Sequence, residues 1–412
     1  MQVALFEDEK FSRFLPLAHT RPVFYLPLAG RRIADWLLDE LKPDVACGIV
    51  RDYLRELALE KGGPRFVERP EEGEVLLVNG RLRPSVAGQL LARLRPGSFL
   101  LHGEDAVAAR LNSGHLSRLS EKGGALEAAA SKLRALGLEP LRASGTPLIE
   151  HLWELHDESR ASFLRRFSAG PGKLGAGLYA LGDVSRLYVD EGAEVASACH
   201  IDTSGGPVYI ARGARLEPFS VVQGPCYLAE GVRVHGAKVR EGSWIGPVVR
   251  LGGEVEESLI AGYSNKAHEG FLGHSVIGEW VNIGSGAQFS DLKNTYGTVR
   301  VVEGPSKVDT GRQKVGAFIG DDAKISIGTL IYSGIRIGVA SHVAGLVNVD
   351  VPSFTLYMNG RAAPLDLDKA LEIRRRMMAR RSLALSRAEQ KVLEEVFYLT
   401  KEERERSPLL QA

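Results

Sequence analysis

The sequence predicts a Rossmann-like α/β domain, then a β-helix made of hexapeptide repeats, then a C-terminal helical tail. Three observations lead to this fold class. Short apolar runs alternate with helical patterns over roughly the first 165 residues. Apolar residues then recur at every sixth position, a period that fits neither a helix nor a plain strand. The 46 glycines crowd into the second half of the chain, which indicates that two architectures are joined.

The first domain, expected over residues 1–165, contains three candidates for the buried strands of a parallel sheet. They are Val3–Phe6, Val45–Val50 and Glu74–Val78, and a helical pattern over Ile33–Leu41 separates the first two. Ligands of parallel sheets bind at the carboxyl ends of the strands. The loops that follow the first and third strands are therefore expected to carry any binding site of this domain.

The remaining boundaries follow from changes of period and composition. An amphipathic helix is expected over residues 148–156, where it would close the first domain. Residues 166–182 have the composition of a linker, because Ser168–Gly177 is rich in glycine. We expect the β-helix over residues 183–355 and the helical tail over residues 356–412.

The repeat consists of several runs of apolar residues spaced six apart. Each of these residues is expected to point inward and to stack on its counterpart in the next coil, with roughly 18 residues in each triangular coil. A polar stretch, Thr310–Lys314, interrupts the repeat and belongs to a loop expected to leave the coil at about 290–316. The runs are Val189–Ile201, Ile210–Val234, Val239–Leu251, Phe271–Phe289 and Ile319–Val349.

The bulk composition excludes several function classes. The 412 residues carry a formal net charge of +1, so no global field directs the chain to nucleic acid or to a membrane surface. No apolar stretch approaches the ~18 to 20 residues of a membrane span. The three cysteines are far apart and match no zinc or redox spacing, and the acidic N-terminal segment is unlike a signal peptide. We therefore expect a cytoplasmic protein whose site residues include no metal ligands.

The loop after the first strand carries a resemblance. The segments Arg13-Phe-Leu-Pro16, His19-Thr-Arg-Pro22 and Leu26-Pro-Leu28, followed by a helix, resemble the opening of sugar-1-phosphate nucleotidyltransferases. In that family this loop cradles a nucleoside triphosphate. The resemblance implies that Arg13, Asn79 and Gly80 contact a nucleotide. It also implies that Asn79–Gly80 lies near the position of an acidic metal ligand.

This loop departs from the family pattern. It has no glycine, it carries three acids in Glu7–Glu9, and Val23 stands where the family has a lysine. Backbone amides approach a phosphate less easily past side chains, and the acids repel a polyanion unless a metal intervenes. Two interpretations stay open. The domain catalyses nucleotidyl transfer with Mg²⁺, or it only binds a sugar phosphate weakly or packs.

A second resemblance lies in the repeat. The motifs Lys266-Ala-His268, Phe271-Leu-Gly273 and Val281-Asn-Ile-Gly-Ser-Gly286 have the order and spacing found in one family of bifunctional enzymes. They resemble the acetyltransferase half of the N-acetylglucosamine-1-phosphate uridyltransferase/glucosamine-1-phosphate acetyltransferase family. The resemblance implies a left-handed β-helix, acetyl-CoA as the acyl donor, a small-molecule sugar substrate and a homotrimer.

His268 takes the position of the catalytic histidine of this family. Acyl transfer from a thioester needs a base for the proton of the attacking amine or hydroxyl, and an imidazole with an ordinary pKa near ~6.5 is suited to this. The alternative is that His268 is a surface histidine at a coil corner. His274, one hexad later, is expected to be its neighbour on the next face rather than a second base.

Six further residues are expected to bind the substrate. Asn282 takes the place of an asparagine that contacts the amino sugar, and Phe271 replaces a tyrosine, which removes one hydroxyl from the pocket. Glu256–Glu257 stands near a lysine that binds the sugar phosphate, so the acceptor is expected to differ from glucosamine 1-phosphate. Lys293 and Asn294 bind a phosphate or hydroxyl, or else form a capped turn. The predicted set is Asn265, Lys266, Phe271, Asn282, Lys293 and Asn294.

The tail begins after Pro364, where the apolar period becomes helical. Its arginines, Arg374–Arg376 and Arg380–Arg381, have two interpretations: a solvated helix face, or contacts with the phosphates of coenzyme A. Ser386 and Glu389 have the spacing of a capping box, so a further helix is expected to begin there.

These features lead to one expected function and two alternatives. We expect an acetyl-CoA-dependent acyltransferase that acts on an amino sugar, a sugar phosphate or a nucleotide sugar, with His268 as the general base. The first alternative is a bifunctional enzyme whose first domain also makes a nucleotide sugar and needs Mg²⁺. The second is a trimeric scaffold that binds a sugar phosphate without catalysis.

Overall fold

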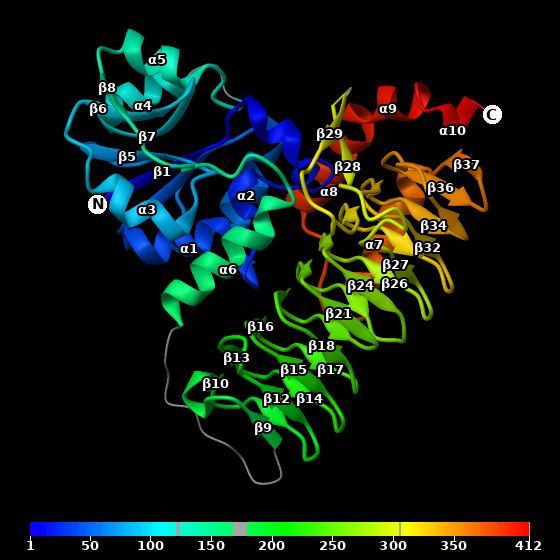
Figure 1. Ribbon diagram of the computed structural model, residues 1–412. Coiled ribbons are helices and arrows are strands. Elements are labelled where there is room, and N and C mark those ends of the chain that lie inside the picture. Colours follow the sequence, from blue (N-terminus) through cyan, green and yellow to red (C-terminus); the bar gives the residue numbers. More distant parts are fainter. Residues whose placement is uncertain (121–123, 168–178, 305, 412) are drawn as a thin grey trace. The chain divides into compact units, whose positions relative to one another are not determined.

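The computed structural model describes residues 1–120, 124–167, 179–304 and 306–411, and the chain forms two compact units (Figure 1). The predicted linker segment Ser168–Gly177 lies outside the described residues, and the predicted domain boundaries stay predictions. The first unit comprises Met1–Leu26, Arg32–Glu154 and Ser386–Glu395. The second unit comprises Pro27–Arg31, Leu155–Leu385 and Val396–Ala412.

The first unit is built on a six-stranded sheet with the order β4-β1-β5-β7-β6-β8. β1 (Gln2–Phe6) pairs in parallel with β4 (Val45–Ile49) and β5 (Glu74–Asn79), so the three predicted strands are confirmed. The sheet is mixed rather than wholly parallel, because β7 (Asp105–Asn112) runs antiparallel to both of its neighbours. Those neighbours are β5 and β6 (Ser98–His102), and β6 in turn pairs in parallel with β8, which covers Glu139–Arg142.

Helices cover both faces of this sheet. On one face, α4 (Ser113–Ser120) and α5 (Ala129–Ala135) contribute leucines and alanines to a buried cluster that includes Phe6 and Leu77. On the opposite face lie α1 (Ile33–Leu41), at its predicted position, and α3 (Pro84–Leu91) (Figure 1). A shorter helix, α2 (Arg55–Lys61), follows β4. The sheet is therefore buried on both sides, as a parallel arrangement requires.

The helix predicted over residues 148–156 is wrong for most of its length. Only Glu154–His156 is helical, at the start of α6 (Glu154–Arg166). The preceding residues run extended along the loop after β5, where the Ile149 amide donates to the Arg81 carbonyl at 2.8 Å and Leu148 forms a bridge to Leu82. This pairing satisfies backbone groups that a helix would otherwise have used.

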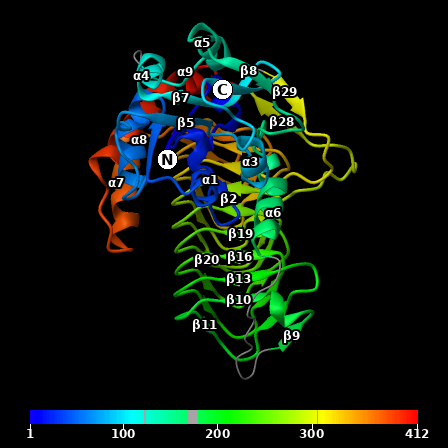
Figure 2. The ribbon, with the colours of Figure 1, turned by 90° about the vertical axis from the view of Figure 1, so that its left-hand side faces the viewer.

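The second unit is a parallel β-helix of the left-handed type, with short strands that stack coil on coil (Figure 2). Sheet A contains β10 (Leu187–Val189), β13 (Val208–Ile210), β16 (Cys226–Leu228), β19 (Ser243–Ile245), β22 (Leu259–Ile260), β25 (Val276–Ile277), β30 (Phe318–Ile319) and β33 (Arg336–Ile337). Sheet B contains β11 (Glu194–Val195), β14 (Arg215–Leu216), β17 (Arg233–Val234), β20 (Arg250–Leu251), β23 (Asn265–Lys266), β26 (Asn282–Ile283), β31 (Lys324–Ile325), β34 (His342–Ala344), β36 (Thr355–Met358) and β37 (Arg361–Pro364). Sheet C contains β9 (Tyr179–Leu181), β12 (His200–Asp202), β15 (Val221–Gln223), β18 (Lys238–Val239), β21 (Glu254–Glu256), β24 (Phe271–Gly273), β27 (Gln288–Phe289), β32 (Leu330–Ile331) and β35 (Leu346–Val347).

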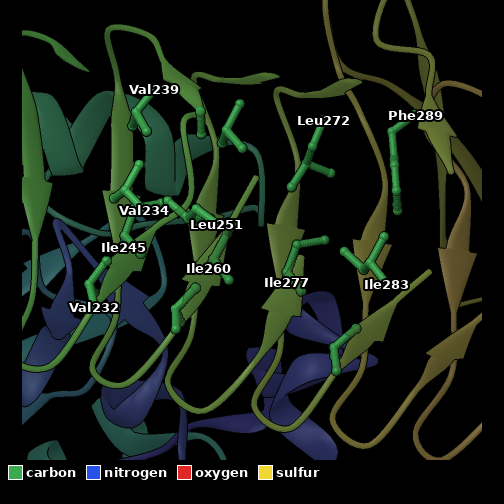
Figure 3. Close-up of a cluster of buried hydrophobic side chains, with 14 of the residues drawn as sticks. Val232, Val234, Val239, Ile245, Leu251, Ile260, Leu272, Ile277, Ile283 and Phe289 are labelled. Carbon is green, nitrogen blue, oxygen red and sulfur yellow. The ribbon is translucent and has the colours of Figure 1, made fainter. Parts of the chain in front are cut away.

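Aliphatic side chains from the three sheets fill the interior, as the six-residue period predicts. Figure 3 shows Leu251, Leu272, Ile277 and Ile283 pointing inward from strands of all three sheets. Burying such a column removes most of its apolar surface from water, which is the main source of stability of a solenoid. Sheet A illustrates the stacking with the inward column Ile210, Leu228, Ile245, Ile260, Ile277, Ile319 and Ile337.

The six-residue spacing predicts the wrong inward residue at two positions. Leu272, which is fully buried, fills the interior in place of Phe271, and Val347 does so in place of Val349. Phe271 instead faces outward from sheet C. The reason is that the coils differ in length: Cα partners are 18 residues apart for Arg215 and Arg233 but only 15 for Arg250 and Asn265.

Two segments do not follow the hexapeptide repeat. Between β27 and β30 the chain forms an antiparallel hairpin of β28 (Arg300–Glu303) and β29 (Ser306–Asp309). After β37 come α7 (Leu367–Ala379), α8 (Arg387–Leu399), α9 (Lys401–Glu405) and α10 (Pro408–Gln411). The capping box at the start of α8 is confirmed, because Ser386 and Glu389 exchange hydrogen bonds at 3.0 and 3.1 Å. None of the helices among the described residues is long and apolar enough to cross a membrane.

Candidate active site

The predicted base lies at a corner of the β-helix. β23 of sheet B ends at Lys266 and β24 of sheet C begins at Phe271, so His268 lies in the turn between the two sheets. Its side chain is exposed. Among the described residues, none forms a hydrogen bond or ion pair with its ring. The imidazole is therefore accessible to a molecule that binds at this corner.

Lys266 holds the turn that carries His268. It is the register partner of Leu251 and takes an interior position, where its side chain is only 2% exposed. Its Nζ donates to the carbonyl oxygens of Gly252 and His268, both at 2.8 Å. Burial lowers the pKa of Lys266 to about 8, although the charge of Glu269 opposes the shift. The structure thus places this predicted substrate contact inside the core, where it fixes the main chain of His268.

Two predicted substrate-binding residues lie side by side on the outer face of sheet B. Asn265 and Asn282 are Cα partners on adjacent strands, and the Asn265 Nδ2 donates to the Asn282 Oδ1 at 2.9 Å. This bond orients both side chains and leaves the Asn282 amide group and the Asn265 carbonyl pointing away from the pair. The pair therefore offers one donor group and one acceptor group close to the turn of His268.

Phe271 lies on the outer face of sheet C, on the other side of the same turn. Its amide donates to the Gln288 Oε1 at 2.8 Å. Its ring covers Gly273, since a Cβ atom there would lie 2.5 Å from the Phe271 ring and 2.5 Å from an oxygen of Asp291. Gly273 is thus needed for this packing, and the ring and the carboxylate share the space above it.

The predicted charge reversal at Glu256–Glu257 is partly offset by neighbouring cations. Glu256 is 8% exposed and forms ion pairs at 3.0 Å with Arg240 and with Lys314. Its hydrogen bond raises the pKa of Lys314. Glu257 pairs with Arg160 at 3.3 Å. Arg240 also pairs with Glu254 at 3.4 Å and with Glu241 at 3.8 Å, so carboxylates already engage both cations and no net positive charge remains beside Phe271.

A histidine–aspartate pair was not predicted from the sequence. The His274 Nδ1 lies 2.7 Å from an oxygen of Asp291, and His274 is in the left-handed region at φ 46°. His156 of α6 lies near this pair, and neither of its buried ring nitrogens has a hydrogen-bond partner among the described residues. Burial, then the charges of His274 and Arg312, lower the pKa of His156 to about 3. The signal that could have found the pair is the 17-residue spacing of His274 and Asp291, one coil length here.

The remaining predicted residues of the β-helix lie in the segment before the hairpin. The Lys293 Nζ donates to the Thr298 carbonyl at 2.5 Å, and the Tyr296 amide donates to the Lys293 carbonyl. Lys293 is thus bonded within its own turn, as in the capped-turn interpretation. Asn294, next to it, is exposed.

In the first unit, the three predicted nucleotide-binding residues lie at the carboxyl edge of the sheet. Arg13 forms an ion pair with Glu150 at 2.5 Å. Asn79 is fully buried, and its Nδ2 donates to Asp8 at 2.8 Å. Gly80 follows it, and a Cβ atom there would lie 2.9 Å from the Phe24 ring. Each residue is therefore engaged within the protein.

The centre of this edge is a guanidinium. Arg81 is 1% exposed and pairs with Asp8 at 2.7 Å, Glu150 at 2.8 Å and Asp105 at 3.2 Å. Burial opposes its charge, but the three carboxylates together raise the pKa of Arg81. Lys10 adds a pair with Asp105 at 2.5 Å. With Arg13, three cations face three carboxylates.

This arrangement fits Mg²⁺ poorly. A magnesium ion needs oxygen ligands in octahedral geometry, whereas these carboxylates converge on a permanent cation. In the part of the chain that the structure describes, no group of three or more histidine, cysteine, aspartate or glutamate side chains is arranged to hold a metal. The first acid of the loop is also neutralised within the protein, since Glu7 is buried and pairs with Arg51 at 3.0 Å.

Comparison with known proteins confirms the predicted resemblance. Residues 3–168 match the family model described as sugar nucleotidyl transferase. Over 100 residues the chain is 36% identical to the bifunctional sugar-1-phosphate nucleotidylyltransferase/acetyltransferase of Sulfurisphaera tokodaii, with 24% of this chain and 25% of that protein aligned. Over 249 residues it is 26% identical to the bifunctional protein GlmU of Nitrosospira multiformis, with 58% and 48% aligned.

These alignments cover only part of each relative. The chain spans a quarter of the first relative and about half of the second. Among solved structures, the UDP-N-acetylglucosamine acyltransferase of Francisella novicida aligns with 58% of this chain and 93% of its own, at 13% identity and a TM-score of 0.30. That last similarity carries no information on function. The chain is thus similar to transferases, and its own activity is a matter for proposal.

Proposed function

We propose that the β-helix unit is an acyltransferase that transfers the acyl group of acetyl-CoA to the amino group of a phosphorylated or nucleotide-linked sugar. One observation carries the proposal. The exposed ring of His268 stands in a turn fixed by Lys266, next to the Asn265–Asn282 pair. The activity named for the relative from Sulfurisphaera tokodaii supports the reaction class. A homotrimer in the cytoplasm is part of the same proposal.

In the proposed reaction, His268 takes a proton from the amino group of the acceptor. The nitrogen attacks the thioester carbonyl, a carbon–nitrogen bond forms, and the carbon–sulfur bond breaks. The thiolate of coenzyme A leaves and receives the proton from the imidazole. A well-placed base contributes on the order of 10²- to 10⁴-fold to such a step. Backbone amides at the coil corner are suitable donors for the intermediate oxyanion.

The charges around Phe271 support an acceptor that differs from glucosamine 1-phosphate. Arg240 and Lys314 attract an anion, but Glu256 already pairs with both cations, and Glu254 and Glu241 also pair with Arg240. A phosphate at this place competes with these carboxylates for the same hydrogen bonds. An acceptor whose phosphate reaches beyond this cluster avoids the competition.

The second candidate is a bifunctional enzyme that also makes a nucleotide sugar. The match of residues 3–168 to a sugar nucleotidyl transferase model favours it. The paired charges around Arg81 oppose it, because a triphosphate must displace three carboxylates from that guanidinium.

The test is the release of free thiol from acetyl-CoA by the full chain, screened over amino sugars, their 1-phosphates and nucleotide-linked forms. With the best acceptor, His268→Ala is expected to lower the rate by about 10²- to 10⁴-fold. The matched control is His235→Ala, since His235 lies on the outer face of sheet B but pairs with Glu217 at 2.8 Å. This control is expected to keep the rate.

A third variant distinguishes the two histidines. If His274→Ala abolishes turnover while His268→Ala does not, the base is the His274–Asp291 pair and the proposed assignment is wrong. If no acceptor releases thiol above the background rate, the scaffold interpretation replaces the enzyme.

A further inference from the structure

A column of side chains on the outer face of sheet B changes character along the β-helix. The first outward residues of successive strands are Cα partners, so they stand about 4.8 Å apart. Three arginines precede the two asparagines of the candidate active site in this column. In order, the residues are Arg215, Arg233, Arg250, Asn265 and Asn282.

The three arginines differ in their partners. Arg215 forms an ion pair with Glu194 at 2.9 Å. Among the described residues, no carboxylate pairs with Arg233 or Arg250, although the two stand on adjacent strands. Adjacent like charges repel each other, so this pair is unfavourable unless another group neutralises it.

The end of α7 adds two more arginines to the same place. Near its middle, α7 is anchored to the β-helix by Arg374, which pairs with Asp322 at 3.0 Å and covers the Trp280 ring. At its C-terminal end, Arg380 and Arg381 follow. Burial, then the charges of Arg250, Arg380 and Arg233, lower the pKa of Arg381. Arg381 therefore lies within electrostatic reach of the other three arginines.

Arg381 also has an unmet hydrogen-bond donor. Its Nε is buried and has no partner among the described residues. The negative end of the α7 dipole accounts for cations at Arg380 and Arg381. It does not account for Arg233 and Arg250, which belong to the β-helix, nor for a buried donor without an acceptor. An anion with several oxygen acceptors would satisfy all of these groups.

We propose that Arg233, Arg250, Arg380 and Arg381, here called the arginine cluster, form a binding site for a phosphate-bearing small molecule. Guanidinium groups suit phosphate because their N–H groups match its oxygens two at a time. Four positive charges match a pyrophosphate or a pair of phosphates better than a single carboxylate. The site adjoins Asn265, so its ligand lies next to the candidate active site.

Two sources of the phosphate share this chemistry. One is the nucleotide part of a nucleotide-linked acceptor, whose sugar would then lie toward Asn282. The other is the nucleotide part of coenzyme A. The site itself does not depend on acyl transfer, because it is defined by the four arginines and not by turnover.

The experiment measures the binding of inorganic pyrophosphate to the full chain by calorimetry at low ionic strength, where screening is weak. The double variant Arg233→Gln with Arg250→Gln is expected to bind about 10-fold or more weakly, because each lost charge-assisted hydrogen bond contributes at least that factor. Arg215→Gln is the matched control, since it stands in the same column but is already paired. It is expected to bind like the unaltered chain.

Further arms identify the source and guard against a folding artefact. Loss of binding that appears with coenzyme A but not with a nucleotide sugar assigns the site to the donor. Loss that appears with a nucleotide sugar but not with coenzyme A assigns it to the acceptor. Without ligand, the double variant is expected to melt at or above the temperature of the unaltered chain, because repulsion is relieved. The proposal is overturned if the unaltered chain does not bind pyrophosphate, or if Arg215→Gln weakens binding as much as the double variant.

Discussion

In the first unit, the charged side chains at the carboxyl edge of the sheet pair with one another, with Arg81 between Asp8, Asp105 and Glu150. In the described part of the β-helix unit, several ionisable side chains form no ion pair. Lys266 donates only to carbonyl oxygens, and the ring nitrogens of His156 have no hydrogen-bond partner among the described residues. The carboxyl edge of the sheet and the His268 corner of the β-helix are both places where a ligand is expected to bind. Only the β-helix corner has side chains that are not already paired with one another.

This contrast in charge pairing indicates where a ligand can bind and react. Paired charges at a sheet edge are stable by themselves, and a ligand must break them before it binds. Unpaired or shifted groups are held at a cost by the surrounding fold, and such groups concentrate at functional sites. The comparison therefore favours chemistry on the β-helix, although the family model matches the first unit.

The largest expected effect is on the free energy of unfolding, and it comes from the paired charges of the first unit. Arg81→Ala leaves Asp8 and its neighbours without their shared partner at a site where Arg81 is 1% exposed. Removing one member of a buried ion pair costs about 3–5 kcal/mol. We expect the free energy of unfolding to fall by about that amount, measured by urea denaturation at pH 7.

The control for this prediction is a cation of the same unit at its surface. Arg110 lies 3.5 Å from Glu74, and both side chains are at least one-third exposed. Arg110→Ala is expected to change the free energy of unfolding by about 1 kcal/mol or less. Equal losses for the two variants would mean that the Arg81 network is not a buried, self-neutralised cluster.

The second prediction concerns His156 of the β-helix unit and the dependence of protein stability on pH. Burial, then the charges of His274 and Arg312, lower its pKa to about 3 in the folded state, whereas an unfolded histidine has a pKa near ~6.5. The unfolded state therefore binds the proton first. Stability contributed by neutral His156 is present above pH ~6.5 and is lost as the pH falls toward 3.

We expect His156→Leu to remove part of this acid sensitivity. Between pH 6.5 and 4, its free energy of unfolding should fall by about 2–3 kcal/mol less than that of the unaltered chain. The control is His200→Leu, since His200 is half-buried on sheet C. Parallel curves for His156→Leu and the unaltered chain would show that His156 is not buried as a neutral ring.

Lys266 gives a smaller effect of the same sign, in a window at higher pH. Burial lowers its pKa to about 8, below the ~10.4 of an unfolded lysine. Between these values the unfolded state holds more protons, so stability rises as the pH rises from 8 toward 10.4. Lys266→Met should lack about 1–3 kcal/mol of this rise, whereas the exposed Lys238→Met should retain it. A rise that survives in Lys266→Met would place the lysine outside the core.

The six-residue period was enough to predict the fold, but it did not predict the direction of every side chain. Six-residue spacing predicts a β-helix because only a repeating coil needs it, and Ile277 and Ile283 lie inward as expected. Spacing alone cannot decide between two adjacent apolar residues when the coil length varies, so Phe271 was placed inward where Leu272 lies. The prediction of a helix over 148–156 was wrong because the backbone there pairs with the loop of Arg81 instead.

The candidate site was predictable where its residues share a motif. His268, Asn265 and Asn282 lie at one corner region, as their spacing in the chain suggests. The pairs that come from neighbouring coils were missed. His274 meets Asp291, and Arg233 meets Arg250, only because one coil has 17 residues here rather than the expected ~18. Charge networks such as that of Arg81 join distant segments and leave no local pattern.

One measurement tests the comparison most directly. A single preparation of the full chain is given acetyl-CoA, nucleoside triphosphates, Mg²⁺ and a panel of amino sugars and sugar 1-phosphates, and the release of free thiol and of pyrophosphate is followed in parallel. We predict thiol release that disappears in His268→Ala, with no pyrophosphate release above background from any pair of substrates. Pyrophosphate release that survives in His268→Ala, without any thiol release, would contradict this prediction.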